Sequence, residues 1–448
     1  MRRLRLHLFL LSLAFAAAPA AAEDLLQVYR DAKAYDAQYA ASRHSLQAGL
    51  EKLPQGRALL LPTLNLSGNT TATRIDGYFR NSSAPPSLRD VHSYGYTLSF
   101  AQPVFRAQNW AQHDQAEQQV RQAEASFGQA SQDLILRVTQ AYVDVLAAQD
   151  NLALVNAQKA AIGEQLAQAK RNFEVGTATI TDTHEAQARF DLTTAQGIVA
   201  QNEVDTKIRA LQQLTGKVYA RLRPLRAEVK LSPPDPANMQ SWVELAEKQS
   251  YPVTIQEAGT EIASLQTKFA RAGHYPTLDI VGTYGTTSQT GAPIAGFTVP
   301  AQSSINRTGT LGLQFALPIY QGGAISSRER EAAANHEKAK QDLENARRSS
   351  ALSAQQNYLL VINGIATIGA LEQALVSSQS ALESNKLGYE VGVRINIDVL
   401  NAQQQVFSTR RDLLVARYGT IMNHFRLKAA AASLREDDLE QANRALEP

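Results

Sequence analysis

Two parts of the chain alternate bulky and small side chains with the two-residue period of a β-strand. In the first part the bulky positions are Tyr94, Tyr96, Leu98 and Phe100. In the second they are Leu311, Leu313, Phe315, Leu317 and Ile319. Shorter apolar segments at 64–66 and 278–280 precede them across polar loops, so the pattern predicts two β-hairpins. A transmembrane barrel strand needs one bulky and one small or polar face over about 10 residues, although a soluble sandwich gives the same alternation.

A second pattern, with apolar residues three, four or seven positions apart, runs through 107–173 and 324–389. Both stretches are rich in Ala, Gln, Leu, Glu and Lys and contain no proline, which predicts two very long helices. The first apolar seam is Leu134, Val138, Ala141, Val145, Ala148, Leu152, Val155, Ile162, Leu166, Ala169 and Phe173. The second is Tyr358, Val361, Ile365, Ile368, Leu375, Leu382 and Tyr389. Helices of about 65 residues reach about 100 Å, far beyond a bilayer's hydrocarbon thickness, so they should project from any membrane.

Shorter helical stretches, 181–214 and 396–434, follow a Val-Gly pair after each long helix, which predicts that each long helix folds back as an antiparallel hairpin. Further helices are expected at 24–53 and 251–271, before each first strand. Many seam positions are Ala or Gly, which let helices approach closely and favour a wide, thin-walled ring. An ordinary helical bundle with an Ala-rich core is the alternative interpretation of the helices alone.

These elements occur twice, in the same order. ALLLPTLNLSG at 58–68 matches AGHYPTLDIVG at 272–282, and QAYVDVL from Gln140 matches QNYLLVI from Gln356. NFEVGTATITDTHEAQ from Asn172 matches GYEVGVRINIDVLNAQ from Gly388. Because the offset stays nearly constant, we interpret the chain as a duplication of one structural unit. The expected boundaries are 1–22 for a signal peptide, 23–217 and 251–434 for the repeats, 218–250 for a linker, and 435–448 for a charged, frayed tail.

Four strands in one chain are too few to close a membrane barrel, because single-chain barrels begin at about 8 strands and an open edge in lipid leaves backbone groups unpaired. Several copies must therefore share one barrel. Prolines at 62, 103, 276 and 318 are expected to end strand pairing where the chain turns into a helix.

Composition predicts that the chain is exported and excludes several kinds of functional site. The Arg-rich, then apolar start that ends in Ala20-Ala21-Ala22 predicts a cleaved secretory signal. No later stretch approaches the roughly 20 apolar residues of a spanning helix, so a membrane crossing would need strands. The chain has no cysteine, which excludes disulfides, thiolate metal sites and Cys nucleophiles. A net charge of +2 predicts no electrostatic attraction to nucleic acid.

No pattern of catalytic residues is present. His184-Glu185 and His336-Glu337 lack the second His that a helical zinc site requires four residues on, so both pairs are interpreted as solvated helix residues. Gly322-Gly323 has no following GK[ST] and predicts a turn rather than a phosphate loop. The sequence therefore predicts neither an enzyme nor a bound metal or cofactor.

The duplicated order of helix, strand pair, long helix, turn and returning helix, with FEVGTATITD and YEVGVRINIDVLNAQ at the turns, resembles the TolC family of outer-membrane efflux proteins over essentially the whole mature chain. The resemblance implies an α+β membrane protein that forms a homotrimer. Its 12-stranded outer-membrane barrel, four strands per chain, would continue into a long periplasmic α-helical barrel. It also implies docking, through a periplasmic adaptor (membrane fusion) protein, to an inner-membrane pump of the RND, ABC or MFS class.

The resemblance also assigns roles to residues at the two turns. The periplasmic aperture ring would use Asp398 and the position one turn later, Asn401, which is often a second Asp in the family. The gate-constraining links would be Tyr389 and Arg394, with Thr181 and Asp182 as their counterparts on the first hairpin. The adaptor-docking tips would be Val175, Gly176, Val391 and Gly392.

The aperture can also be analysed without the family. Three Asp398 carboxylates around a narrow axis would raise one another's pKa and attract cations. The resemblance adds that Asn401, where the family often has a second Asp, would weaken this attraction. The alternative interpretation is that Asp398 is a helix N-terminal charge that the macrodipole favours. Gly176 and Gly392 could likewise be ordinary helix C-caps. A non-channel periplasmic coiled-coil scaffold or adaptor is the alternative function. The cargo, which could be a drug, a metal ion or a polypeptide, is not determined by the sequence.

Overall fold

The computed structural model describes residues 23–77, 87–219, 221–226, 231–292, 302–444 and 446. The predicted signal peptide, 1–22, lies outside these residues. The chain divides into two units. We call His44–Phe127 with Tyr251–Arg347 the sheet unit, and Met1–Arg43 with Gly128–Ser250 and Arg348–Pro448 the helical unit.

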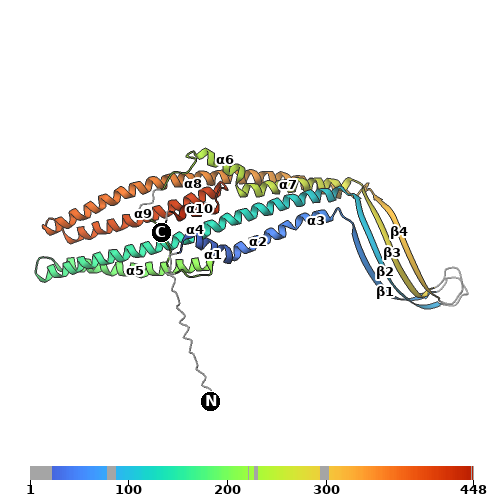
Figure 1. Cartoon of the computed structure of the whole chain (residues 1–448), viewed down its shortest axis with the longest axis horizontal. Coiled ribbons are helices and arrows are strands. Elements are labelled where there is room, and N and C mark those ends of the chain that lie inside the picture. The colour runs from blue at the N-terminus through green and yellow to red at the C-terminus, as the bar shows by residue number, and fades with distance from the viewer. Residues whose placement is uncertain are drawn as a thin grey trace, which may run out of the picture. The chain divides into compact units, whose positions relative to one another are not determined.

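The sheet unit contains both predicted hairpins in one antiparallel sheet. Its strands are β1 (Thr63–Gly77), β2 (Ser87–Phe105), β3 (Thr277–Ala292) and β4 (Gln302–Ala316). They follow the order β1-β2-β3-β4, so that β2 and β3, which come from different halves of the chain, pair at the centre (Figure 1). Among the described residues, β1 and β4 each have one neighbouring strand only.

The register places the bulky positions of the four strands on one face. Leu66 pairs with Leu98, Phe100 with Gly282, and Gly282 with Leu311. Because side chains alternate between faces, the neighbouring small and polar positions share the opposite face. The bulky side chains are exposed in the single chain; Leu66, Leu311 and Leu313 expose 73%, 79% and 72% of their surface. The predicted alternation is confirmed, and no described residue of the sheet unit covers the apolar face.

Two details at the strand ends differ from the prediction. β4 ends at Ala316, so Leu317 and Ile319 lie beyond it. Pro103 lies inside β2 rather than at its end, where the register with β3 shifts between Pro103 and Phe105. A proline cannot donate to the ladder but is tolerated at such a bulge. Next to the bulge, Arg106 donates two hydrogen bonds to the buried Asp279 carboxylate of β3, at 2.8 and 2.6 Å.

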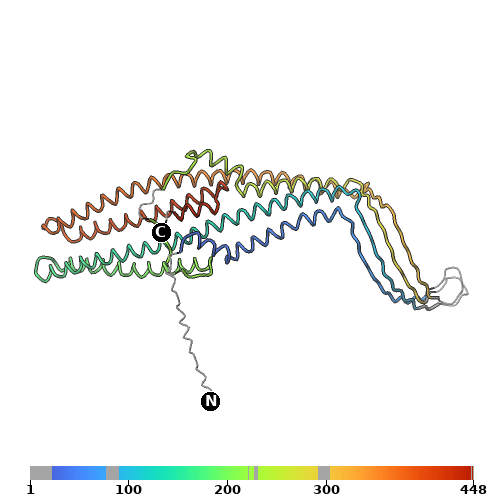
Figure 2. Tube along the Cα trace, in the orientation of Figure 1, coloured from blue at the N-terminus to red at the C-terminus, as the bar shows by residue number. Residues whose placement is uncertain are grey.

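The two long helices and their returns form as predicted. α4 (Ala107–Glu174) pairs with α5 (Ile180–Thr215), and α8 (Ala324–Glu390) with α9 (Asn396–Ala430). Figure 2 shows each pair as an antiparallel hairpin. The expected helix at 24–53 is divided into α1 (Leu25–Tyr35), α2 (Ala37–Leu50) and α3 (Lys52–Ala58). α7 (Tyr251–Arg271) has its predicted bounds and continues into the short 3-10 helix η1 (Ala272–His274).

The helical unit has its main core where α4 passes α1 and α9. Leu134, Val138 and Tyr142 of α4 are almost completely buried there. The Tyr142 hydroxyl donates to the backbone oxygens of Glu23 and Arg223, at 3.2 and 2.9 Å. Inside the predicted linker, α6 (Met239–Gln249) was missed by sequence reasoning; its Trp242 packs on Val361, Leu427 and Ala431.

The expectation of a frayed C-terminal tail is wrong. Glu436–Asn443 form a further helix, α10, whose Leu439 is fully buried in the main core. Glu436 pairs with Lys33 of α1, and Asp438 pairs with Lys428 of α9 at 2.6 Å. One apolar side chain and two ion pairs therefore fix a segment whose charged composition predicts no structure.

The second apolar seam is far less covered than the first. Among its residues only Val361 is buried, whereas Leu134, Val138, Val145, Ala148, Ile162, Leu166 and Ala169 of the first seam are. Within α8, an 18-residue window has a mean hydropathy of 1.7 and is 6% buried. This contradicts the expectation that no later stretch is apolar enough to span a membrane, although length and composition alone do not make α8 a spanning helix.

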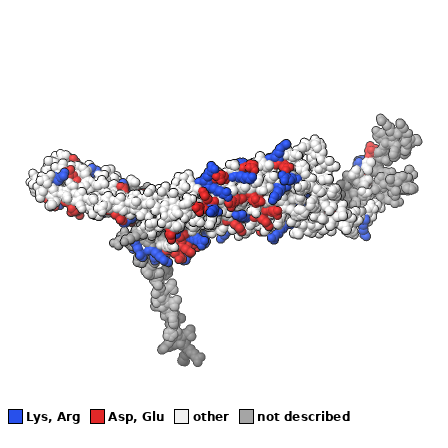
Figure 3. Space-filling model, turned by 90° about the horizontal axis from the view of Figure 1, so that it is seen from above, with Lys and Arg blue, Asp and Glu red and all other residues white. Residues whose placement is uncertain are grey.

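Charges of both signs are interspersed where α7 and the beginning of α8 face the viewer in Figure 3. Arg347 pairs with Glu257 at 3.0 Å and Arg271 with Glu329 at 2.8 Å. Lys338 and Asp342 form a further pair along α8. Since the signs alternate, this surface carries no strong field of either sign.

Candidate functional site at the hairpin tips

The turn of the second hairpin is closed by a left-handed glycine. Gly392 has φ of +80°, and the backbone N–H groups of Val393 and Arg394 both donate to the Gly388 oxygen, at 2.9 and 3.0 Å. This satisfies carbonyl groups that the end of a helix leaves free. The predicted C-cap role of Gly392 is confirmed.

The turn of the first hairpin has the same geometry. Gly176 has φ of +77°, and the N–H groups of Thr177 and Ala178 donate to the Asn172 oxygen. Thr179 then caps α5, because its hydroxyl accepts from the Asp182 N–H while the Asp182 carboxylate accepts from the Thr179 N–H. Both turns expose apolar side chains: Val175, Val391 and Val393 are 73%, 65% and 77% exposed.

The two hairpins contact each other just above their tips. Leu166, Ala169, Ala186 and Leu400 form a small buried cluster that Phe190 and Ile397 flank. Polar contacts surround it: Asn172 Nδ2 donates to the Tyr389 hydroxyl at 3.2 Å, and Asn396 Nδ2 donates to the Asp182 backbone oxygen at 3.4 Å. The tips of the two hairpins in one chain are therefore held together by packing and by hydrogen bonds.

Arg394 folds back onto its own hairpin. Its guanidinium lies 3.7 Å from the Asp398 carboxylate one turn into α9, and both side chains are partly exposed. The side chain also crosses Gly388, where an added Cβ would lie 2.7 Å from Arg394 Cγ. The absence of a side chain at Gly388 thus sets the path of Arg394 toward Asp398.

The residues predicted to constrain the gate are only partly brought together. Tyr389 contacts Asn172, and the Asp182 carboxylate is used in the cap of α5. Within the described part of one chain, no hydrogen bond or ion pair joins the side chains of Tyr389 or Arg394 to Thr181 or Asp182. Asn172, Asn396 and Arg189 were missed by sequence reasoning. Asn172 opens the first of the two repeated turn motifs, which is the signal that could have identified it.

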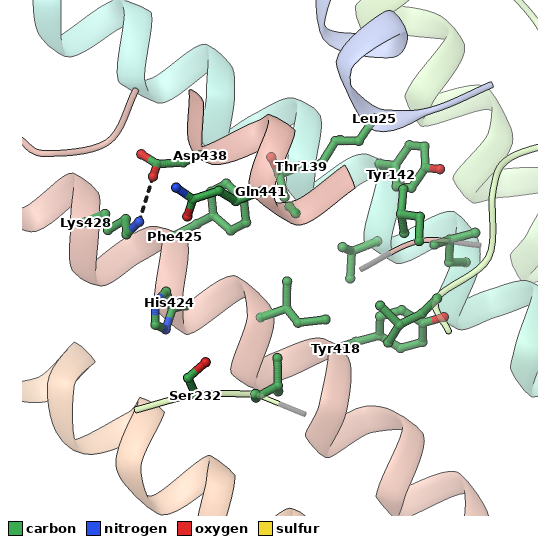
Figure 4. Close-up of a pocket in the computed structure, with 17 residues that line it drawn as sticks. Leu25, Thr139, Tyr142, Ser232, Tyr418, His424, Phe425, Lys428, Asp438 and Gln441 are labelled. Atoms are coloured by element: carbon green, nitrogen blue, oxygen red, sulfur yellow. Dashed lines mark hydrogen bonds and ion pairs between the residues drawn. The ribbon is translucent and has the colours of Figure 1, made fainter. Parts of the chain in front are cut away.

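An apolar cavity of about 220 Å³ lies elsewhere in the helical unit, between α4, α9 and α10 (Figure 4). At its edge the Tyr418 hydroxyl donates to Asp150 at 2.6 Å, and burial raises the pKa of that carboxyl. Burial also lowers the pKa of His424, which faces the same cavity. Lys428 and Asp438 in its wall form an ion pair at 2.6 Å, whereas the buried Thr139 hydroxyl has no hydrogen-bond partner among the described residues. No group of three potential metal ligands occurs in the part of the chain that the structure describes.

A sheet with one exposed apolar face, attached to helical hairpins too long for a bilayer, defines a class: envelope proteins whose strands cross a membrane and whose helices project from it. The chain belongs to the outer membrane efflux protein family, whose model matches residues 28–217 and 242–433. It is therefore an outer-membrane protein with a large periplasmic helical portion, and it serves as an exit duct for efflux or secretion. The alternative of a periplasmic scaffold is set aside.

Similar proteins agree with this assignment. The chain is 33% identical over 433 residues to the outer membrane protein TolC of Vibrio cholerae, covering 95% of this chain and 94% of that protein. It is 30% identical to the proteases secretion protein PrtF of Dickeya chrysanthemi, covering 94% and 91%. The fold matches the crystal structure of the outer membrane protein VceC from Vibrio cholerae with a TM-score of 0.76 at 19% identity, covering 91% and 96%. The family and these relatives are channel proteins rather than enzymes.

Proposed function

We propose that three copies of the chain assemble into one duct, in which the three sheets close a 12-stranded barrel in outer-membrane lipid. The observation that carries the proposal is the pair of sheet edges: among the described residues β1 and β4 each have one neighbouring strand, while the sheet exposes a face of Leu, Phe and Tyr. An open edge in lipid leaves N–H and C=O groups without partners, so β1 of one copy must pair with β4 of the next.

The helices support the same assembly. In the single chain most of the second seam on α8 is only partly buried, and the apolar residues Leu359, Leu360 and Val376 beside it are about half exposed. In a trimer, neighbouring hairpins would cover this apolar surface and form a helical barrel. Such a barrel conducts drugs, small molecules or proteins passively, and selection among them lies in the inner-membrane pump.

The hairpin tips form the periplasmic end of this duct. We infer that Asp398 and Asn401 of three copies surround the aperture, and that Tyr389, Arg394, Thr181 and Asp182 hold it closed through contacts that include neighbouring copies. The exposed Val175-Gly176 and Val391-Gly392 turns would contact a periplasmic adaptor protein, which joins the duct to an RND, ABC or MFS pump.

Disulfide trapping tests the assembly. Because the chain has no cysteine of its own, only the introduced cysteines can form disulfides. A set of Cys pairs, one in β1 and one in β4, should link neighbouring copies and give covalent trimers on denaturing gels. The matched control is Ser67→Cys with Thr97→Cys, whose positions pair within one chain and should yield monomers only. If every β1–β4 pair gave only monomers in outer-membrane preparations, the shared barrel would be refuted.

Gene deletion tests the cargo. Parallel assays of drug sensitivity, metal-ion tolerance and secreted protein in the deletion strain should show which transport stops. If none of the three changed, a role as exit duct would be contradicted.

A further inference from the structure

Near the hairpin tips, Arg189 of α5 links the first hairpin to the second. Among the described residues, it is the only charged side chain that does so there. Its guanidinium donates to Asn401 Oδ1 at 3.1 Å and to Gln404 Oε1, both on α9. The planar fork of Arg suits two acceptors that lie one turn apart on a helix. Arg189 lies next to the small buried cluster along α5, since Ala186 is one of the buried residues of that cluster and Phe190 flanks it.

Both acceptors of Arg189 are uncharged amides, whereas the other arginine contact at the tip, from Arg394, is with a carboxylate. Arg394 faces the Asp398 carboxylate at 3.7 Å. Among the described residues, no carboxylate lies within ion-pair distance of Arg189. The Arg189 charge is therefore not neutralised by an ion pair. Arg189 bonds to Asn401, which lies one helical turn after Asp398.

We propose that Arg189 is a gating residue that clasps the two hairpins of each chain through Asn401 and Gln404, and that its uncompensated charge offsets the cation attraction of Asp398. The proposal rests on the duct function above and goes beyond it in assigning a residue and a mechanism. Since neither acceptor titrates, the clasp holds at any pH at which the protein is folded. Because the Asn401 amide is uncharged, it binds the Arg189 guanidinium less tightly than a carboxylate would, so the contact between the hairpins can break when the duct opens.

Single-channel recording of the trimer in planar bilayers tests this. Arg189→Gln should raise the open-to-closed ratio about tenfold, because a hydrogen bond from a charged donor contributes about that factor. It should also shift the reversal potential in a salt gradient toward cation selectivity. The matched control is Arg171→Gln, which removes an exposed arginine of the same hairpin whose side chain makes no described bond to the second hairpin.

Asn401→Asp gives a second, independent arm. With Arg189 present, the new carboxylate should form an ion pair and lower the open-to-closed ratio. In the Arg189→Gln background the same change should leave a bare carboxylate and increase cation selectivity. This reversal of the effect is a readout that simple misfolding does not produce.

The outcomes separate the two levels of inference. If wild-type protein forms closed channels but Arg189→Gln behaves like Arg171→Gln, the clasp is refuted and the duct stands. The clasp is refuted as well if Asn401→Asp acts identically in both backgrounds. If wild-type trimers give no channels under any condition, the duct itself fails.

Discussion

Arg137 of α4 lies between two carboxylates and shows how single residues stabilise the helical unit. Its guanidinium donates to both Asp36 oxygens, at 2.9 and 3.1 Å, and to Asp133 at 2.9 Å. Asp36 is nearly buried, whereas Asp133 is about half exposed. The hydrogen bonds from Arg137 lower the pKa of Asp36 below its ordinary value. This pair therefore ties the α1–α2 junction to α4 only while Asp36 is ionised.

Asp36→Asn should destabilise the helical unit by about 2 kcal/mol at neutral pH, because a hydrogen-bonded charge pair with one buried member is lost. Since the folded-state pKa of Asp36 is lowered, its contribution is complete above the unfolded value of about 3.9 and is lost as pH falls toward the folded value. Denaturant unfolding followed by circular dichroism from pH 7 to pH 3 measures this. The variant should lose less stability on acidification than the wild type.

Asp133→Asn is the matched control, since it removes the exposed partner of the same arginine. It should cost less than about 1 kcal/mol. Equal costs for the two variants would contradict the role assigned to burial of Asp36.

At the scale of elements, the two turns matter most, because each reverses a long helix within a few residues. The left-handed glycines at Gly176 and Gly392 make this reversal possible, with open space around both. Any other residue would adopt that conformation at a cost of about 1–2 kcal/mol. The turns are thus locally strained for all residues except glycine, while the surrounding hairpins are not.

Gly392→Val should impair export while trimers still form, because it distorts and blocks one tip without touching the sheet or the cores. Export by the assembled system and heat-modifiable trimers on gels measure the two properties. Gly369→Ala is the control: Gly369 lies inside α8 with open space around it, and alanine should stabilise the helix by about 0.5–1 kcal/mol. Normal export by Gly392→Val would count against a docking role for the tips.

At the scale of the whole molecule, the sheet has a bulky apolar face and a small or polar face. In the assembled barrel the first would face lipid and the second would face water. Leu311 and Leu313 share the bulky face of β4, and Gly312 between them lies on the small face. A charge facing lipid near the bilayer midplane costs about 2–4 kcal/mol, whereas one facing a water-filled lumen costs little. Adjacent residues of the same strand therefore differ in what they tolerate.

Leu313→Arg should reduce the amount of assembled trimer in the outer membrane, and Gly312→Arg, at the same depth, should not. Quantitative blots of heat-modifiable trimer from outer-membrane fractions distinguish the two. Similar losses for both variants would show that the bulky face does not face lipid.

The gate is a second property of the assembled molecule. Replacing Tyr389 with Phe and Arg394 with Ser together should raise the conductance of isolated trimers in planar bilayers, because the contacts with Asn172 and Asp398 are lost. Gly388→Ala, which crowds the path of Arg394, should give a smaller increase. Unchanged conductance in the double variant would refute the assignment of these residues to the gate.

Much of the architecture follows from local pattern. The long helices were predicted to within a residue or so at their ends, because Ala-rich, proline-free sequence fixes helix by itself. The bounds of β4 and the position of Pro103 were not, since a bulge depends on the neighbouring strand and on the pair of Arg106 with Asp279. Likewise, Tyr389 and Asp398 were identified from the turn motif, but their contacts with Asn172 and Arg394 required the fold.

By itself, the sequence determined the period of each element, the duplication and the turn glycines, because these depend on side chains close along the chain. Only the tertiary structure decided that residues 436–443 form a buried helix, that β2 and β3 pair across the repeats, and that Arg189 reaches Asn401 and Gln404. The physical reason is range. Burial and long side-chain hydrogen bonds join residues hundreds of positions apart, and no periodicity along the chain records which of them will meet.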